Sequence, residues 1–205
     1  MIVIINYGMG NLGSIFNMLK KMGVEAIISS DCSEIEKADK LILPGVGSFD
    51  NGMKNIVELG LLQPLHKKII EEKTPILGIC LGMQLFTKKS EEGTLPGLGW
   101  LDGEVIKFDF HDKKGSTKIP HMGWNSISAI RQDTLLSGLS SESRFYFVHS
   151  YYVVCGEEDI LAKTYYGYDF ASVVRKDNIF GIQFHPEKSH KYGVRIFDNF
   201  SKMIH

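Results

Sequence analysis

Apolar runs alternate with segments of helical periodicity over residues 1–80. The four runs, all rich in isoleucine, leucine or valine, are MIVIIN (1–6), VEAIIS (24–29), KLILP (40–44) and PILGI (75–79). Continuous apolar runs of this kind are typical of parallel strands that are buried on both faces. Two segments between the runs, 11–23 and 61–73, place their apolar residues on one helical face. The alternation predicts an α/β fold in which helices flank a doubly wound, largely parallel sheet.

The pattern changes after residue 98, where aromatic residues become more frequent and the apolar runs become shorter. The runs are 100–110, 144–155, 160–166, 170–176 and 178–185. We expect them to form additional antiparallel or edge strands that pack against the first half of the chain. Because no repeat or linker divides the sequence, we expect residues 1–205 to form a single domain.

Charge and cysteine content exclude several classes of protein. The net charge of −1 provides no attraction to nucleic acid or to an anionic membrane, and no apolar run approaches the length of a membrane span. Cys32, Cys80 and Cys155 lie far apart, which argues against a disulfide framework or a metal site. The chain begins directly with a strand-like run rather than a signal peptide. We therefore expect a cytoplasmic protein that holds neither a metal nor another cofactor.

The first loop carries the spacing of a dinucleotide-binding motif. Gly8, Gly10 and Gly13 match G-x-G-x-x-G between a strand-like and a helix-like run, and Asp31 follows the second strand. A dinucleotide, however, requires two mononucleotide-binding halves, and only one precedes the next motif in the chain. We interpret the glycines as a tight turn that lets strand and helix pack closely, and keep a non-enzymatic dinucleotide-binding module as a remote alternative.

A second motif indicates nucleophilic chemistry. In PILGICLGMQLF, residues 75–86, an apolar strand runs into Gly78-Ile79-Cys80-Leu81-Gly82 and a helix follows at once. This is the pattern of a nucleophile elbow with cysteine in the position of serine. The sharp turn exposes the nucleophile and leaves no room for side chains at the two glycines. A buried structural cysteine is the alternative, but the two glycines at these offsets favour the nucleophile.

A cysteine nucleophile needs a base, because an ordinary thiol with a pKa of about 8.5 is mostly protonated at neutral pH. His185 ends a strand-like run, and Glu187 follows two residues later. In extended chain these two side chains point to the same side, so the carboxylate can orient the imidazole. Alone, the pair could be a surface histidine beside a surface glutamate. Together with the elbow, it forms a coherent Cys–His–Glu triad.

The stretch LPGVGSFD, residues 43–50, supplies the third component of such a site. A peptide flanked by Gly45 and Gly47 can turn an N–H toward a developing oxyanion, and the N–H of Leu81 can supply a second donor. A tight turn between a strand and a helix would explain the same glycines, and both interpretations can hold together.

Several motifs resemble one known family. PGVGSF, GICLGMQL, SEEG and HPEKS resemble the class I, triad-type glutamine amidotransferases. KIPHMGWN and YFVHSYYV narrow the resemblance to the glutaminase subunits of imidazole glycerol phosphate synthases. The resemblance covers nearly the whole chain. It implies hydrolysis of glutamine to glutamate and ammonia through a γ-glutamyl thioester.

The resemblance also implies a partner. Ammonia would pass to a (βα)₈-barrel cyclase, which forms a heterodimer with the glutaminase. The cyclase makes imidazole glycerol phosphate and aminoimidazole carboxamide ribotide in histidine biosynthesis. A paralogous subunit that supplies ammonia for bacterial surface-sugar biosynthesis remains an alternative, because segments 164–170 and 187–193 resemble that branch slightly more closely.

The family assigns roles to individual residues of this chain. The catalytic residues are Cys80, His185 and Glu187, and the oxyanion region comprises Gly45, Val46, Gly47 and Leu81. The glutamine-binding residues are Gln84, Glu92, His149, Ser150 and Tyr151. The residues expected at the partner interface are Asn11, His121, Met122, Trp124, Asn125, Tyr146 and Lys188. Glu92 could instead be an ordinary solvated glutamate, and Trp124 and Tyr146 could be core aromatics.

Overall fold

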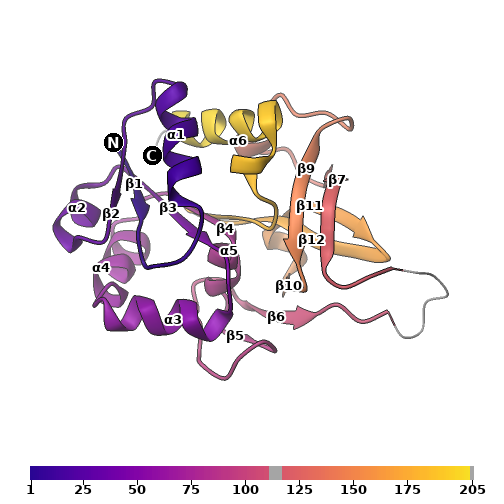
Figure 1. Ribbon diagram of the computed structural model, residues 1–205, viewed down its shortest axis with the longest axis horizontal. Coiled ribbons are helices and arrows are strands. Elements are labelled where there is room, and N and C mark those ends of the chain that lie inside the picture. Colours follow the sequence, from indigo (N-terminus) through magenta and orange to yellow (C-terminus); the bar gives the residue numbers. More distant parts are fainter. Residues whose placement is uncertain (111–116, 204–205) are drawn as a thin grey trace.

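The computed structural model describes residues 1–110 and 117–203. Its main sheet has eight strands in the order β2-β1-β3-β4-β13-β12-β11-β8 (Figure 1). The strands span Ala26–Ser29 (β2), Ile2–Ile5 (β1), Lys40–Gly45 (β3), Ile76–Cys80 (β4), Ile179–Ile182 (β13), Tyr168–Lys176 (β12), Ile160–Tyr166 (β11) and Ser128–Ala129 (β8). The first five pair in parallel, and the last three join through antiparallel pairings. The expected α/β class is confirmed.

Two smaller sheets accompany the main sheet. One has the order β10-β6-β5, formed by Tyr151–Cys155, Gly103–Lys107 and Lys89–Ser90. The other is a two-stranded antiparallel ribbon of β7 (His121–Ser126) and β9 (Arg144–His149). In Figure 1 this ribbon stands at the end of the molecule away from β1 and β2.

Helices cover both faces of the main sheet. On one face, α1 (Leu12–Lys21) and α6 (His190–Lys202) lie together, as the upper part of Figure 1 shows. On the other face lie α2 (Cys32–Lys37), α3 (Phe49–Glu58) and α4 (Leu62–His66), the last continued by a π-helical turn at Lys67–Glu71. The remaining elements are α5 (Leu81–Leu85) and short 3₁₀ turns at Thr134–Leu136, Glu157–Asp159 and Pro186–Lys188.

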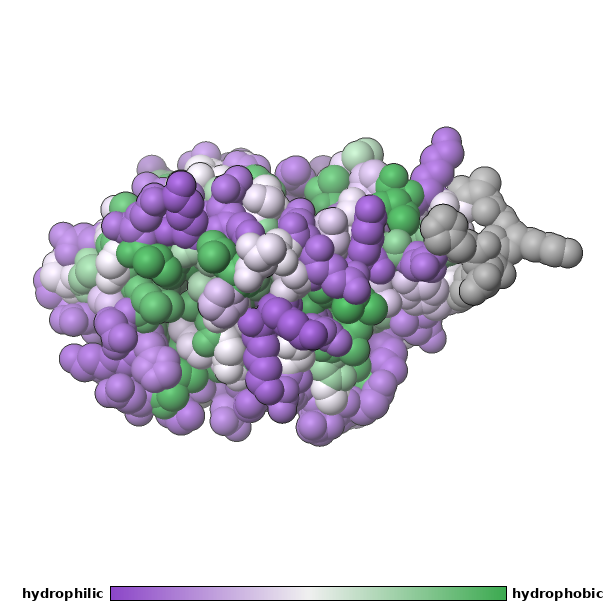
Figure 2. Space-filling view, turned by 90° about the horizontal axis from the view of Figure 1, so that it is seen from below, coloured by the Kyte–Doolittle hydropathy of each residue, from purple (hydrophilic) through white to green (hydrophobic). Residues whose placement is uncertain are grey.

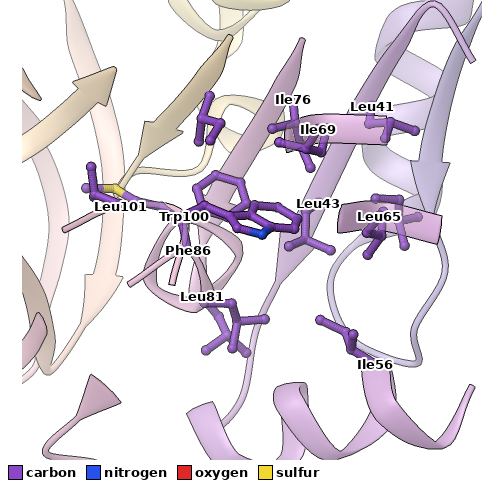
Figure 3. Packing of buried hydrophobic residues seen from close by; sticks show 14 of the residues in the cluster. Leu41, Leu43, Ile56, Leu65, Ile69, Ile76, Leu81, Phe86, Trp100 and Leu101 are labelled. Atoms are coloured by element: carbon purple, nitrogen blue, oxygen red, sulfur yellow. The ribbon is translucent and has the colours of Figure 1, made fainter. Parts of the chain in front are cut away.

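Two apolar clusters, one on each face, hold the layers together. On the face covered by α3 and α4, Trp100 packs against Phe86 with ring centroids 5.4 Å apart, close to Leu43 of β3 (Figure 3). On the other face, α1 and α6 contribute Ile15 and Phe197. Burying each side chain of this size contributes about 1.5–3 kcal/mol, so the paired clusters stabilise the sheet that carries the site.

The first four predicted strands agree with β1, β2, β3 and β4 to within two residues at each end. One expectation about the C-terminal half is confirmed only in part. For the run 178–185, β13 pairs antiparallel with β12, but it lies inside the main sheet and also pairs in parallel with β4. Gly181 makes this position possible: a Cβ there would lie 2.6 Å from Cγ of Met83. Pairing direction depends on distant partners, which hydrophobic periodicity does not report.

Figure 2 shows a mainly hydrophilic face, on which hydrophobic residues form small, interrupted patches. Within the described ranges, no helix combines the length and the apolar character needed to span a bilayer. Over the same residues, His, Cys, Asp and Glu side chains nowhere gather in a group of three or more suited to a metal ion.

Candidate active site

Cys80 lies at a strained turn between β4 and α5. Its backbone has φ 54° and ψ −109°, in the left-handed half of conformational space that L-residues rarely adopt. Such a conformation costs about 1–3 kcal/mol and persists only where the surroundings hold it. A Cβ on Gly82 would lie 1.8 Å from the carbonyl oxygen of Leu43, and one on Gly78 would lie 2.5 Å from the ring of Phe86. The predicted steric reason for the flanking glycines is confirmed.

His185 and Glu187 form a buried pair beside this turn. His185 Nδ1 and Glu187 Oε1 are 2.9 Å apart, and each side chain is 1% exposed. Burial alone would lower the pKa of His185, but the adjacent Cys80 thiolate and the bond to Glu187 raise it to about 10. His185 Nε2 is buried and has no hydrogen-bond partner of good geometry among the described residues. This nitrogen is therefore available to exchange a proton.

Sheet register brings the histidine to the cysteine. β13 lies next to β4, and Ile182 pairs with Ile79, one residue before Cys80. The strand ends of β4 and β13 therefore leave the sheet side by side. The backbone N–H of His185 also donates to the carbonyl of Tyr146 at 2.9 Å, which ties the histidine to the ribbon.

The predicted oxyanion segment lies on the other side of Cys80. Gly45, the last residue of β3, pairs in register with Cys80. Val46 follows and is 44% exposed, and Gly47 has a φ of 122°. A Cβ on Gly47 would lie 2.5 Å from Cε of Met9, so the first loop of the chain packs directly on this segment. A peptide in such surroundings can present an N–H to the space above the sulfur.

Cys80 and part of the predicted oxyanion segment line a cavity of about 330 Å³, whereas His185, Glu187 and Gly45 are not among its lining residues. Its lining comprises Val46, Gly47, Cys80, Leu81, Gln84, Glu92, Pro120, Val148, His149, Ser150 and Tyr151. Every residue predicted to bind glutamine is in this set. Pro120 and Val148 are additions: they lie within the motifs KIPHMGWN and YFVHSYYV but were not predicted as site residues. A larger hollow of about 830 Å³ lies near Phe180 and Asn199, but its described lining contains neither cysteine nor histidine. The chemistry therefore favours the smaller cavity.

Two of the predicted glutamine-binding residues also make internal hydrogen bonds. Burial raises the pKa of Glu92, and its Oε2 accepts a hydrogen bond from the N–H of Phe49 at 2.8 Å. This bond connects the cavity to the start of α3. The amide nitrogen of Gln84 donates to the carbonyl of Tyr151 and to Oε1 of Gln183, both at 3.1 Å. Nε2 of Gln84 is therefore already hydrogen-bonded to two acceptors of the protein itself.

Sequence reasoning missed Gln183. This side chain is fully buried, and its Nε2 donates to Cys80 Sγ at 3.5 Å. Continuing the two-residue alternation backwards from Glu187 through His185 would have found it, because every second residue of an extended chain faces the same side.

The residues predicted at the partner interface separate into two groups. Met122 and Trp124 are 63% and 49% exposed on the ribbon. Tyr146 is partly exposed, with the ammonium of Lys188 5.5 Å from its ring centre. In contrast, His121 is only 3% exposed, so we exclude its side chain from any docking surface. Its ring stacks on Tyr166, whose centroid is 4.0 Å away.

The two remaining interface predictions are partly exposed. Asn11 precedes α1 and makes no side-chain capping bond, whereas Asn125 donates to the carbonyl of Tyr165 at 3.0 Å. One exposed neighbour was not predicted: the ring of His190 stacks on Trp124 with centroids 5.3 Å apart. The exposed surface around Trp124 therefore extends from the ribbon to the start of α6.

The glycine loop has a structural role. Cβ atoms on Gly10 and Gly47 would lie 3.0 Å and 2.5 Å from Pro44 and Met9, so protein atoms fill the space beside both. Asp31 caps α2 by accepting a hydrogen bond from the N–H of Ser33 at 2.7 Å. The Asp31 carboxylate, which would bind the ribose of a dinucleotide, is therefore already hydrogen-bonded within the protein. Gly10 fits the interpretation of the loop as a packing turn, but Gly13 does not, because an added Cβ there would have nothing within 4 Å.

The other two cysteines are not paired. Cys32 and Cys155 are both free and partly buried. Burial and the nearby carboxylates of Asp159 and Glu158 raise the pKa of Cys155 to about 12. A thiol with such a pKa is a poor nucleophile near neutral pH.

Comparisons with known proteins agree with the site. The family model "Glutamine amidotransferase class-I" matches residues 3–203. The chain is 57% identical to imidazole glycerol phosphate synthase subunit HisH 2 of Methanococcus maripaludis, over 98% of this chain and 99% of that protein. It is 48% identical to subunit HisH 2 of Pseudomonas aeruginosa, over the full length of both.

Solved structures share the fold at lower identity. One, described as a glutamine amidotransferase, superposes with a TM-score of 0.71 at 23% identity and covers 97% of this chain and 96% of that chain. A putative GMP synthase protein from Thermoplasma acidophilum gives a TM-score of 0.72 at 24% identity, with 98% of this chain and 91% of that chain covered. The elbow, the neighbouring histidine and the full-length family match together show that the chain belongs to the class I glutamine amidotransferases.

Proposed function

We propose that this chain hydrolyses glutamine to glutamate and ammonia, and that it serves as the glutaminase subunit of an imidazole glycerol phosphate synthase. One observation carries the chemistry: Cys80 lines a cavity at a strained elbow, and the buried pair of His185 and Glu187 follows β13, the strand that pairs with β4. The printed names of the full-length relatives support the assignment to histidine biosynthesis.

In the first half-reaction, the thiol proton of Cys80 moves to Nε2 of His185, and the sulfur attacks the side-chain carbonyl carbon of glutamine. The raised pKa of His185 favours this thiolate–imidazolium state. The N–H of Leu81 and the peptide at Gly45–Gly47 stabilise the oxyanion. The C–N bond then breaks, His185 protonates the departing nitrogen, and ammonia leaves a γ-glutamyl thioester on Cys80.

In the second half-reaction, His185 removes a proton from water, and the resulting hydroxide attacks the thioester carbon. The C–S bond breaks, the proton returns to the sulfur, and glutamate departs. Glu187 keeps the imidazole in one orientation and stabilises its charged form through both steps. Glu92 and the segment Ser150–Tyr151 line the cavity where the zwitterionic end of glutamine would bind.

The partner would be a (βα)₈-barrel cyclase that receives the ammonia in a heterodimer. The exposed side chains of Met122 and Trp124, with the partly exposed Tyr146 and Lys188, support a docking surface on the ribbon. Aromatic residues and methionine are enriched at such interfaces. We further propose that residues 1–205 act as one glutamine amidotransferase domain in the cytoplasm, where the free cysteines would remain reduced.

Labelling with 6-diazo-5-oxo-norleucine tests the chemistry directly. We expect this glutamine mimic to modify Cys80 alone and to abolish glutamate release, which mass mapping and a glutaminase assay will measure. A Cys80→Ala variant should be neither labelled nor active. Modification of Cys32 or Cys155 with Cys80 untouched would refute the proposal.

Complementation distinguishes the pathways. We expect the chain, expressed with its barrel partner, to restore growth of a histidine auxotroph that lacks the glutaminase subunit. Failure beside a functional partner would favour the surface-sugar branch. Titration with NAD(H) or NADP(H) tests the remote dinucleotide alternative, and saturable micromolar binding would support it.

A further inference from the structure

Gln183 is the buried polar residue next to the nucleophile that the proposed mechanism leaves unused. The register of β13 and β4 places it there: Ile182, the last residue of β13, pairs with Ile79, so the residue that follows, Gln183, lies beside Cys80. Its Nε2 is 3.5 Å from Cys80 Sγ, although the two residues are 103 positions apart. A carboxamide can present either nitrogen or oxygen, so the orientation of this group decides its effect on the sulfur.

A backbone carbonyl determines that orientation. The carbonyl oxygen of Tyr151 only accepts hydrogen bonds, so the group of Gln84 that lies 3.1 Å away must be its NH₂. The same NH₂ is 3.1 Å from Gln183 and can only donate to its oxygen. The NH₂ of Gln183 consequently points at Cys80. A flipped Gln183 would place two NH₂ groups against each other.

The carbonyl oxygen of Tyr151, which fixes the orientation of Gln84, also accepts a hydrogen bond from a second residue. His149 Nδ1 lies 2.8 Å from the Tyr151 carbonyl and must donate to it, which leaves Nε2 of His149 as an acceptor. His121 Nδ1 donates to that nitrogen at 3.1 Å, and the amide of Asn125 donates to His121 Nε2 at 3.3 Å. Burial lowers the pKa of His121 to about 4 and that of His149 to about 3, so both rings stay neutral, as these bonds require.

From this directed chain of hydrogen bonds we infer that Gln183 is a catalytic residue, which donates its amide N–H to the Cys80 sulfur and stabilises the thiolate. This inference rests on the proposed role of Cys80 as nucleophile. The imidazolium of His185 attracts the Cys80 thiolate, and the hydrogen bond from Gln183 adds a second, uncharged donor. Because a carboxamide nitrogen is not basic, Gln183 does not compete with His185 for the thiol proton.

The charged and titratable groups around Cys80 come from two elements. His185 follows β13 and is linked to Glu187, and the buried hydroxyl of Tyr7 approaches from the loop after β1. His149, on the ribbon, interacts electrostatically with His185. Because Cys80 and His185 share one proton in the proposed mechanism, the reactivity of the sulfur reports the state of both groups.

Alkylation by iodoacetamide tests the donor without requiring glutamine. The rate of Cys80 modification is measured from pH 5 to 9 by mass spectrometry on the whole chain, with Cys32 as the internal reference. A Gln183→Met variant keeps the length and removes the donor. Since hydrogen bonds to charged groups are among the strongest, we expect about a tenfold slower modification at pH 7 and a half-maximal rate at higher pH. Gln183→Glu is nearly isosteric and should shift the profile in the same direction.

Two further variants separate orientation from folding. Gln84→Met releases the oxygen of Gln183 and should give an intermediate shift. Gln63→Met makes the same chemical change at an exposed position of α4 and should leave the profile unchanged. Profiles of both Gln183 variants that superpose on the unmodified chain, with thermal melting showing intact folds, would overturn the inference. If instead Cys80→Ala retained glutaminase activity, the proposed function itself would fail, which is a distinguishable result.

Discussion

His185 Nδ1 and Glu187 Oε1 are 2.9 Å apart in a setting where each side chain is 1% exposed. The pair is separated by a single residue, Pro186, which begins a 3₁₀ turn. Since the imidazolium cannot be solvated by bulk water here, its charge is stabilised first by the thiolate of Cys80 and then by the hydrogen bond and charge of Glu187. This relationship makes Glu187 the most informative position for testing the proposed mechanism.

We expect Glu187→Gln to lower kcat for glutamine hydrolysis by about two to four orders of magnitude, the usual contribution of general acid–base catalysis. The amide preserves shape but removes the charge that orients and stabilises His185. KM should change little, because Glu187 does not line the cavity. Steady-state assays with the barrel partner present measure both constants. The matched control is Glu58→Gln on the exposed face of α3, and equal losses in both variants would contradict the assigned role.

The neutral histidines predict a pH dependence of stability. An unfolded histidine has a pKa of about 6.5. The pKa values of His121 and His149 in the fold are about 4 and about 3. Between these values the unfolded chain binds more protons, so the free energy of unfolding falls as pH decreases below about 6.5.

His121→Phe should retain the stacking and remove one of these protonation sites. Its melting temperature should therefore fall less steeply between pH 6.5 and 4.5 than that of the unmodified chain. Calorimetry at several pH values measures this slope. An exposed counterpart, His66→Phe, should keep the original slope. Parallel curves for His121→Phe and the unmodified chain would count against the prediction.

Two glycine substitutions should have opposite effects. Gly82→Ala places a Cβ 1.8 Å from the Leu43 carbonyl, a backbone atom that cannot move cheaply. We expect a loss of about 3 kcal/mol or failure to fold. Gly13 lies in α1 with nothing within 4 Å of an added Cβ, so Gly13→Ala should stabilise by about 0.5 kcal/mol. Denaturant unfolding gives both values. A tolerated Gly82→Ala would mean that the elbow is not sterically constrained.

We expect substitution of an exposed aromatic residue on the ribbon to lower the affinity for the partner. We expect Trp124→Ala to weaken binding of the barrel cyclase by about tenfold or more, as truncating a central aromatic residue usually does. Titration calorimetry with the purified cyclase measures the Kd. Val57→Ala removes an exposed apolar side chain from α3 and should not affect binding. Unchanged affinity for Trp124→Ala would place the docking surface elsewhere.

Activation by the partner is a separate prediction. We expect the isolated chain to hydrolyse glutamine slowly, because the peptide at Gly45–Val46 would not yet present its N–H to the oxyanion. The cyclase and its ligand would shift the population toward the productive orientation. Glutamate release is measured with and without cyclase, using saturating glutamine. Rapid turnover by the chain alone, unchanged on adding cyclase, would refute this prediction.

Local patterns predicted much of what the structure contains. The Gly-x-Cys-x-Gly spacing located the elbow because the turn is made within five consecutive residues, although the steric demand on Gly82 comes from Leu43 of β3. The two-residue spacing predicted the contact of His185 and Glu187, but the structure forms it through the 3₁₀ turn at Pro186–Lys188 rather than through extended chain. His121 shows where this reasoning stops: a motif rich in exposed aromatics suggested an interface residue, and packing against Tyr166 buried it.

The sequence alone predicted the candidate nucleophile and its His–Glu pair, because each is marked by a pattern that spans only a few residues. Tertiary structure decided how they meet. The parallel register of β4 and β13 set Gln183 beside Cys80, across 103 positions of chain. The pairing of β7 with β9 set His121 against His149. Such contacts depend on which strands become neighbours, and that is settled by burial over the whole sheet rather than by any local pattern.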